Sequence, residues 1–166
     1  MLLRKSKIFL IILVALWGLV GGINNFLDIE GGYNTVAYTL NTTDAAGQPT
    51  WRAIRMPLVI WLAWALIPLS KLVSSYFCLL GAKQMWKRRK ASAQDFNAAK
   101  GLALLGCCIS MAMLYGGFMI VAENYFLLWK TEVGAAALPQ AFRYLASIAV
   151  LAIFVQQADH ELTSSQ

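Results

Sequence analysis

Four runs of apolar residues, separated by polar stretches, divide the 166-residue chain. Each run is long enough for a helix that crosses the ~30 Å of hydrocarbon in a bilayer, which takes roughly 20 apolar residues. The pattern predicts an all-α integral membrane protein that forms one domain, an antiparallel bundle of four transmembrane helices. The expected spans are about 8–27, 56–82, 100–126 and 136–156.

Between the first two spans lies the longest polar stretch, residues 28–55, which is the predicted external loop. Tyr33, Val36, Ala37 and Leu40 within it have the i, i+3, i+4, i+7 spacing of one helix face. This spacing predicts a short amphipathic helix that lies on the membrane surface or caps the bundle.

Residues 83–99 form the predicted cytoplasmic loop, which is basic. Ser92, with Asp95 three residues later, fits a capping box that opens the third membrane helix. The fourth apolar run reaches about 20 residues only if its helix starts at Ala135, with Pro139 in the first turn. Pro68 lies inside the second span, where a bend is expected because proline lacks the N–H of a regular helix.

Composition and charge agree with a membrane protein. Hydrophobic residues make up 59% of the chain and charged residues only 13%, whereas soluble domains average about 25% charged. The net charge of +6 comes from basic residues beside the spans, as the positive-inside rule requires, and we therefore expect no nucleic-acid binding.

The distribution of Lys and Arg predicts the orientation, with both termini in the cytoplasm. The nine on the predicted cytoplasmic side are Arg4, Lys5, Lys7, Lys83, Lys87, Arg88, Arg89, Lys90 and Lys100, and the four on the external side are Arg52, Arg55, Lys130 and Arg143. We expect the block Lys87, Arg88, Arg89 and Lys90 to contact lipid headgroups.

Lys71 is the residue hardest to explain by packing, because it lies near the middle of the second span. An ionisable residue at that depth indicates function, with a snorkelling or crevice lysine as the alternative. Ser74 and Ser75 lie on the same polar side of the helix, and no Asp or Glu lies at this depth. We therefore expect Lys71, Ser74 and Ser75 to contact a partner chain, a lipid or a ligand.

A second group of polar residues lies near the predicted external ends of the helices. It is expected either to converge on a site or, preferably, to tie helix ends together as a structural network. Its members are Asn24, Asn25, Asp28, Arg52, Arg55, Glu123 and Arg143.

The chain carries no pattern typical of catalysis or metal binding. Its single His, His160, stands alone near the C-terminus, and the pair Cys107-Cys108 does not have the spacing of metal ligands. The methionines of the third span are read as packing residues rather than copper ligands. We expect a protein that is not an enzyme and needs neither a metal nor a cofactor.

Several short strings resemble those of an uncharacterised bacterial family known only as predicted small integral membrane proteins with a domain of unknown function. These strings are Asn24-Asn25 with Asp28, Trp51-Arg52-Ala53-Ile54, Phe96-Asn97 with Ala99-Lys100, Glu123 with Phe126 and Trp129, and Ala141-Phe142-Arg143. The resemblance implies a four-helix protein of the bacterial inner membrane and supplies no activity. It also implies that an acid commonly stands at the position of Lys71 and a Gln at that of Lys130, which argues against proton exchange through a carboxylate here.

Two functions follow as expectations. The first is an accessory or structural subunit of a larger inner-membrane complex, surrounded by lipid and associated with other subunits or with copies of itself. The alternative is a homo-oligomeric small transporter or channel in which Lys71 contacts an anionic substrate.

Overall fold

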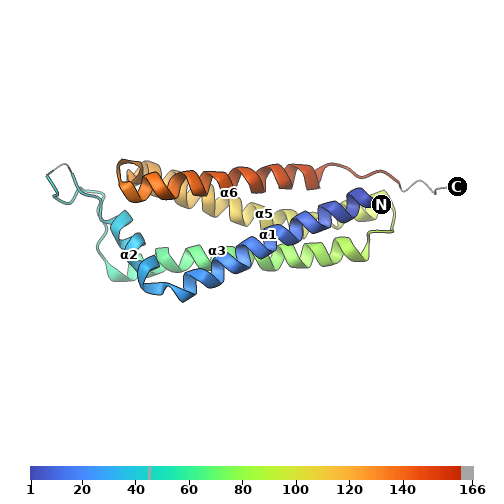
Figure 1. The fold of residues 1–166 in the computed structure, drawn as a ribbon, viewed down its shortest axis with the longest axis horizontal. Coiled ribbons are helices and arrows are strands. Elements are labelled where there is room, and N and C mark those ends of the chain that lie inside the picture. Colours follow the sequence, from blue (N-terminus) through green and yellow to red (C-terminus); the bar gives the residue numbers. More distant parts are fainter. Residues whose placement is uncertain (45, 162–166) are drawn as a thin grey trace.

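The computed structural model describes residues 1–44 and 46–161, and the described part of the chain is mostly helical (Figure 1). Its elements are α1 (Leu2–Leu27), α2 (Ile29–Leu40), α3 (Pro57–Lys87), α4 (Ala93–Ala98), α5 (Gly101–Ala112), η1 (Met113–Tyr125), η2 (Leu128–Lys130) and α6 (Glu132–Gln156). Four helical segments, with residues 93–125 counted as one, are long and apolar enough to cross a membrane. The predicted all-α fold with four such helices is confirmed.

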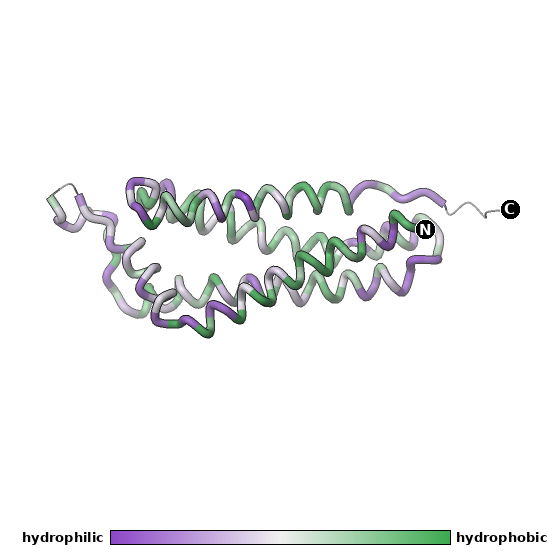
Figure 2. Tube along the Cα trace, viewed as in Figure 1, coloured by the Kyte–Doolittle hydropathy of each residue, from purple (hydrophilic) through white to green (hydrophobic). Residues whose placement is uncertain are grey.

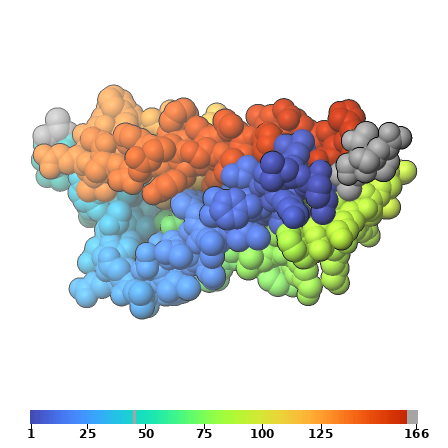
Figure 3. Space-filling model, turned by 45° about the vertical axis from the view of Figure 1, so that its right-hand side comes forward, coloured from blue at the N-terminus to red at the C-terminus, as the bar shows by residue number. Residues whose placement is uncertain are grey.

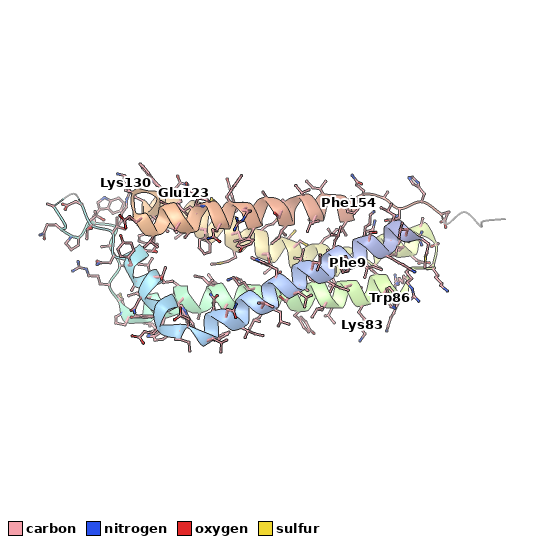
Figure 4. All side chains as sticks on the ribbon, viewed as in Figure 1. Phe9, Lys83, Trp86, Glu123, Lys130 and Phe154 are labelled. Carbon is pink, nitrogen blue, oxygen red and sulfur yellow. The ribbon has the colours of Figure 1, made fainter. Side chains whose placement is uncertain are left out.

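The long helices lie side by side, and the chain reverses direction along the long axis at each connection (Figure 1). One end, here called the terminal end, carries Met1, the α3–α4 turn and the segment after α6. The opposite end, here called the α2 end, carries α2 and the η1–α6 connection (Figure 1). In Figure 4 Lys83 and Trp86 lie near the terminal end, whereas Glu123 and Lys130 lie at the α2 end.

Small residues bring α1 and α3 into close contact. Gly18 lies against the backbone of Lys71, and Gly22 lies against Leu72 and the carbonyl of Pro68. A Cβ atom at Gly22 would lie only 2.8 Å from the Leu72 side chain. Glycine therefore allows the close backbone approach on which helix association in lipid depends.

The contact between α3 and α5 has the same character. A Cβ atom at Gly106 would lie 2.5 Å from Cys78 Sγ and 2.7 Å from the Ser74 carbonyl oxygen, and Gly81 lies directly against the backbone of Ala103. Helix α6 packs on α5 and η1, and its Tyr144 ring lies 5.3 Å from that of Trp17 in α1.

Local capping sets several helix boundaries. Asp28 accepts a hydrogen bond from the Gly31 amide, and this cap starts α2 at Ile29, four residues before the predicted amphipathic pattern. Leu40 and the half-buried Tyr33 and Val36 pack with Ile60 and Phe126. Helix α2 therefore caps the bundle. Of the predicted 28–55 loop, Ala45 lies outside the described residues.

Two predicted features of the later helices need correction. Thr131 caps α6 by accepting a hydrogen bond from the Gly134 amide, so the helix starts at Glu132 and Pro139 lies in its interior instead of its first turn. The predicted capping box is present, with Ser92 Oγ 3.1 Å from the Asp95 amide, but it opens the short α4.

The predicted third span is not one regular α-helix. After α5, residues Met113–Tyr125 form a π-helix, whose wider backbone turn is uncommon over such a length. Leu127 then has a positive φ of 57° and redirects the chain into η2. Nothing in the apolar pattern of this run distinguishes α from π geometry.

Hydropathy follows this arrangement. Hydrophobic positions fill the middle of the long helices, whereas hydrophilic positions gather at the α3–α4 turn, after α6 and around α2 (Figure 2). Hydrophilic positions also occur inside α6, away from its ends (Figure 2).

Candidate functional site

The side chain of Lys71 runs along α1 toward the α2 end. Its Nζ atom would lie 3.5 Å from a Cβ atom at Gly21 and is 3.3 Å from Oδ1 of Asn25, to which it donates a hydrogen bond. The lysine stem therefore packs along α1 beside Gly21 at ordinary van der Waals distance. No Asp or Glu carboxylate lies within 4 Å of this ammonium group among the described residues. The ammonium has three N–H donors and uses one of them here.

Lys71 also lines a cavity of about 510 Å³. The walls come from α2 and α3 on one side and from η1 and α6 on the other, where the two layers of helices separate toward the α2 end (Figure 1). Most of the lining is apolar and includes Met113, Phe118 and Val121 of the π-helix. The volume falls in the range of ligand pockets, about 300–1,000 Å³.

Trp64, which lines the same cavity, carries an unsatisfied hydrogen-bond donor. It lies two turns before Lys71 on α3, is only 6% exposed, and lines the cavity. Its indole Nε1 has no hydrogen-bond partner in the described part of the chain. A buried N–H without an acceptor is costly, so each such group calls for an explanation. The nitrogen lies against Gly32, where a Cβ atom would come within 2.5 Å of it, so a larger residue at position 32 would clash with the indole.

The side chains of Ser74 and Ser75 bond to neighbouring helices and do not share the surroundings of the Lys71 ammonium. Ser74 Oγ is 2.7 Å from the Gly106 carbonyl oxygen and 2.7 Å from Ser110 Oγ. Ser75 Oγ donates to the carbonyl of Ala15 at 2.8 Å. Both serines are buried, and their contacts join α3 to α5 and to α1.

The structure distributes the predicted outer polar network over separate contacts. Arg52 donates to the Tyr125 carbonyl at 3.1 Å, and Arg55 Nε donates to Asn41 Oδ1 at 2.8 Å. Asn25 faces Lys71, and Asp28 caps α2. Side-chain hydrogen bonds or ion pairs between members of the set Asn24, Asn25, Asp28, Arg52, Arg55, Glu123 and Arg143 are absent from the part of the chain described here, because these side chains reach different helix ends. Individual helix ends are tied, but not through one network.

Arg143 lies inside a helix, whereas the sequence placed it at the external boundary. It follows Glu132 by 11 residues and precedes Gln156 by 13, which puts it about 16 Å along α6 at ~1.5 Å per residue. The side chain is exposed and donates to Gln140 Oε1 at 3.3 Å. Ser147, one turn further on, is also exposed. We call Gln140, Arg143 and Ser147 the α6 polar stripe.

The basic block lies at the terminal end, with Lys87, Arg88 and Lys90 exposed and Arg89 half-buried. The Arg89 guanidinium stacks 4.1 Å from the centre of the Trp86 ring. These positions leave the block accessible to headgroups, and contact with headgroups stays a prediction.

A buried ionic cluster at the terminal end escaped the sequence analysis. Asp159 Oδ2 is 2.7 Å from Lys7 Nζ and 2.6 Å from Lys100 Nζ, and all three side chains are 3% exposed or less. Both lysines also donate to the Gln157 carbonyl at 2.7 Å. Asn97 completes the cluster by bonding the backbone of Asp159 on both sides. The segment after α6 is thereby fastened to α1 and to the start of α5.

Burial works to raise the pKa of Asp159, but hydrogen bonds from Lys100 and Lys7 outweigh it and hold that pKa below its usual value. Arg4, 1% exposed, extends the cluster by donating to the carbonyls of Ala91 at 2.7 Å and His160 at 2.9 Å. Arg4, Lys7 and Lys100, which were counted as signals of membrane topology, therefore also hold the fold together. In the sequence, their position at helix ends is the one sign of this role.

The other candidate groups show no sign of a metal centre. Cys78 and Cys107 are buried between α3 and α5, and Cys108 is exposed. Within residues 1–44 and 46–161, no group of three His, Cys, Asp or Glu residues is arranged to hold a metal ion.

Comparison with known proteins adds a family. Residues 3–158 match the family described as "Predicted small integral membrane protein (DUF2165)". Neither the curated proteins nor the solved structures gave a match. Since the match covers nearly the whole chain and agrees with the four apolar helices, this protein belongs to that family of predicted small integral membrane proteins.

Proposed function

We propose that this protein is a non-enzymatic accessory subunit that associates with a larger complex of the bacterial inner membrane through the α6 polar stripe. One observation carries the proposal. Arg143 is exposed well inside an apolar helix of an integral membrane protein. Among the described residues its guanidinium has the Gln140 amide as a hydrogen-bond partner and the Tyr144 ring at 5.6 Å, and it has no carboxylate partner.

The cost of that exposure favours a protein partner. An Arg at the centre of a membrane helix costs about 2.5–3.5 kcal/mol on insertion scales, and such residues face protein or water far more often than lipid. Gln140, Arg143 and Ser147 recur at helical spacing on one face, so a partner helix can cover all three together. Snorkelling along α6 toward its start is the alternative for Arg143. Ser147 Oγ already donates to the Arg143 carbonyl at 2.8 Å, so its part in a contact would be to accept a hydrogen bond from the partner.

Charge complementarity defines the partner. A carboxylate is the best match for a guanidinium, because it accepts two parallel hydrogen bonds. All eight Asp and Glu residues of this chain are described by the structure, and they lie in loops or near helix ends. A second copy therefore offers no acid at the depth of Arg143, and we propose a different membrane chain with an intramembrane Asp or Glu.

We further propose that both termini lie in the cytoplasm. The support is the exposed basic side chains of the terminal end, Lys5, Lys83, Lys87, Arg88 and Lys90, which outnumber the exposed Arg55 and Lys130 of the α2 end. The burial of Arg4, Lys7 and Lys100 reduces the accessible charge of that end without reversing the difference.

Native purification tests the subunit proposal. The tagged protein, extracted in mild detergent from cells that make it naturally, is expected to co-purify stoichiometrically with a larger chain that has an acid in a membrane span. Arg143→Leu is expected to lower the recovered partner at least tenfold, whereas Lys130→Leu, an exposed cation outside the stripe, leaves it unchanged. Recovery of the chain alone, or equal partner recovery with Arg143→Leu, contradicts the proposal.

A small anion transporter or channel is the second candidate, favoured by the position of Lys71 on the cavity. Purified protein in liposomes would then carry a charge-selective flux that Lys71→Leu abolishes. The absence of flux from the monodisperse protein would remove this candidate.

A further inference from the structure

We infer that the cavity beside Lys71 is a binding site for an acidic amphiphile, a molecule with an anionic head and an acyl tail. The inference depends neither on the α6 polar stripe nor on transport. Its sources are Lys71, Trp64 and the apolar wall of η1, which line one cavity, together with the unsatisfied indole N–H of Trp64.

The polar groups match the head of such a ligand. Lys71 offers a positive charge that has no carboxylate partner within the described chain, and its N–H donors are only partly used. Trp64 offers an N–H that has no acceptor in the structure. Both lie on one face of α3, since seven residues make almost two full turns. An oxyanion head supplies the negative charge and the acceptors that the Lys71 ammonium needs. The Trp64 N–H, which lies against Gly32, reaches that head only if the indole or α2 shifts.

The apolar wall matches the tail. Met113, Phe118 and Val121 line the cavity, and all belong to the π-helix. Methionine adapts its shape to irregular neighbours, and π-helical turns are frequent at functional sites. An inorganic anion would leave this wall without a partner, and an uncharged hydrocarbon would leave Lys71 and Trp64 unsatisfied. An amphiphile satisfies both parts.

Two sources offer this chemistry: a fatty acid with its carboxylate and an anionic phospholipid with its phosphate. Photo-affinity labelling distinguishes them. The protein is placed in nanodiscs of neutral phosphatidylcholine with one of three diazirine probes, which are palmitic acid, phosphatidylglycerol and the uncharged alcohol hexadecanol. After irradiation, labelled peptides are identified by mass spectrometry.

We expect at least one acidic probe to label Met113–Val121 at least tenfold more than the alcohol does, because a charge-assisted hydrogen bond contributes enough for that ratio. The stronger acidic probe identifies the source. Equal labelling by acid and alcohol, or labelling by both acids only outside η1, overturns the inference, and this comparison needs no variant.

Matched variants then assign the head-group contacts. Lys71→Met is expected to reduce labelling about tenfold and Lys71→Arg to retain it. Trp64→Phe, which keeps an aromatic ring but removes the N–H, is expected to reduce it severalfold. Lys83→Met is the control, because Lys83 is an exposed lysine on the same helix that does not line the cavity and lies near the terminal end (Figure 4). Undiminished labelling of a monodisperse Lys71→Met protein contradicts the role of the charge.

Discussion

The Nζ atom of Lys7, on the second turn of α1, lies 2.7 Å from the Oδ2 atom of Asp159, beyond the end of α6. This buried pair, which Lys100 shares, joins residues 152 positions apart in sequence. In the space-filling view α1 and α6 lie against each other toward this terminal end (Figure 3). The cluster closes the bundle at the end opposite the cavity.

Removal of the central acid is expected to destabilise the fold. Asp159→Asn leaves Lys7 and Lys100 buried without a counter-charge, and breaking a buried pair in this way costs about 3 kcal/mol even where carbonyl contacts remain. The measurement is unfolding of the detergent-solubilised protein. Glu30→Gln, at an exposed acid of α2, is the control and is expected to stay within about 0.5 kcal/mol of the wild type.

The same carboxylate predicts a dependence of stability on pH. Because the pKa of Asp159 is lower in the folded protein than its usual value of about 3.9, its contribution is fully present above that value. The contribution is lost as the pH falls from about 3.9 through the lowered folded pKa. Acid titration of the unfolding midpoint is expected to show a drop in this window that Asp159→Asn lacks, and an identical drop in the variant would exclude Asp159 as its source.

Close packing of α3 against α5 predicts opposite outcomes for two glycines. Gly106→Ala places a Cβ atom against Cys78 and the backbone of Ser74, so the helices must separate at a cost of about 1–3 kcal/mol. Gly116→Ala meets no atom within 4 Å and is expected to be neutral or stabilising. Thermal unfolding of both variants in one detergent provides the comparison, and equal midpoints would show that this contact is not tight.

Reporter fusions test the proposed topology. Fusions at Gln94 and after Glu161 are expected to read cytoplasmic, and a fusion at Thr43 is expected to read external. The physical reason is the excess of exposed Lys and Arg at the terminal end, which resists translocation. A cytoplasmic reading at Thr43 would show that the bundle has the opposite orientation in the membrane.

The sequence predicts the individual helices of this fold better than it predicts which side chains of different helices come into contact. Apolar run length is enough to predict four helices, and the spacing from Tyr33 to Leu40 predicts a short helix that is present. The Ser92–Asp95 box predicts a helix start, which is present, although the helix that it opens is the short α4. Such signals are local, because capping and periodicity act within one or two turns. Helix α6 starts at Glu132 and not at the predicted Ala135, because Thr131 caps it, although Pro139 favours a later start.

The pairing of Lys7 with Asp159 could not be predicted from the sequence, because it depends on which helix ends meet in the folded protein. The same holds for Trp64, whose indole looks ordinary in sequence and is distinctive only because it is buried without an acceptor. Lys71 was recognised from its depth alone, yet Ser74 and Ser75 turned out to join helices, since residues three and four positions further along α3 face α5 and α1.

Site-specific photo-cross-linking in cells tests the subunit proposal most directly. A photoreactive residue at Ser147, one turn from Arg143, is expected to form an adduct with one other membrane chain, and Arg143→Leu is expected to abolish that adduct. The same photoreactive residue in place of Leu62, which is exposed on α3, is expected to give no such adduct. If position 147 yields no protein adduct, or if positions 147 and 62 capture the same chains equally, the α6 polar stripe is not a docking face.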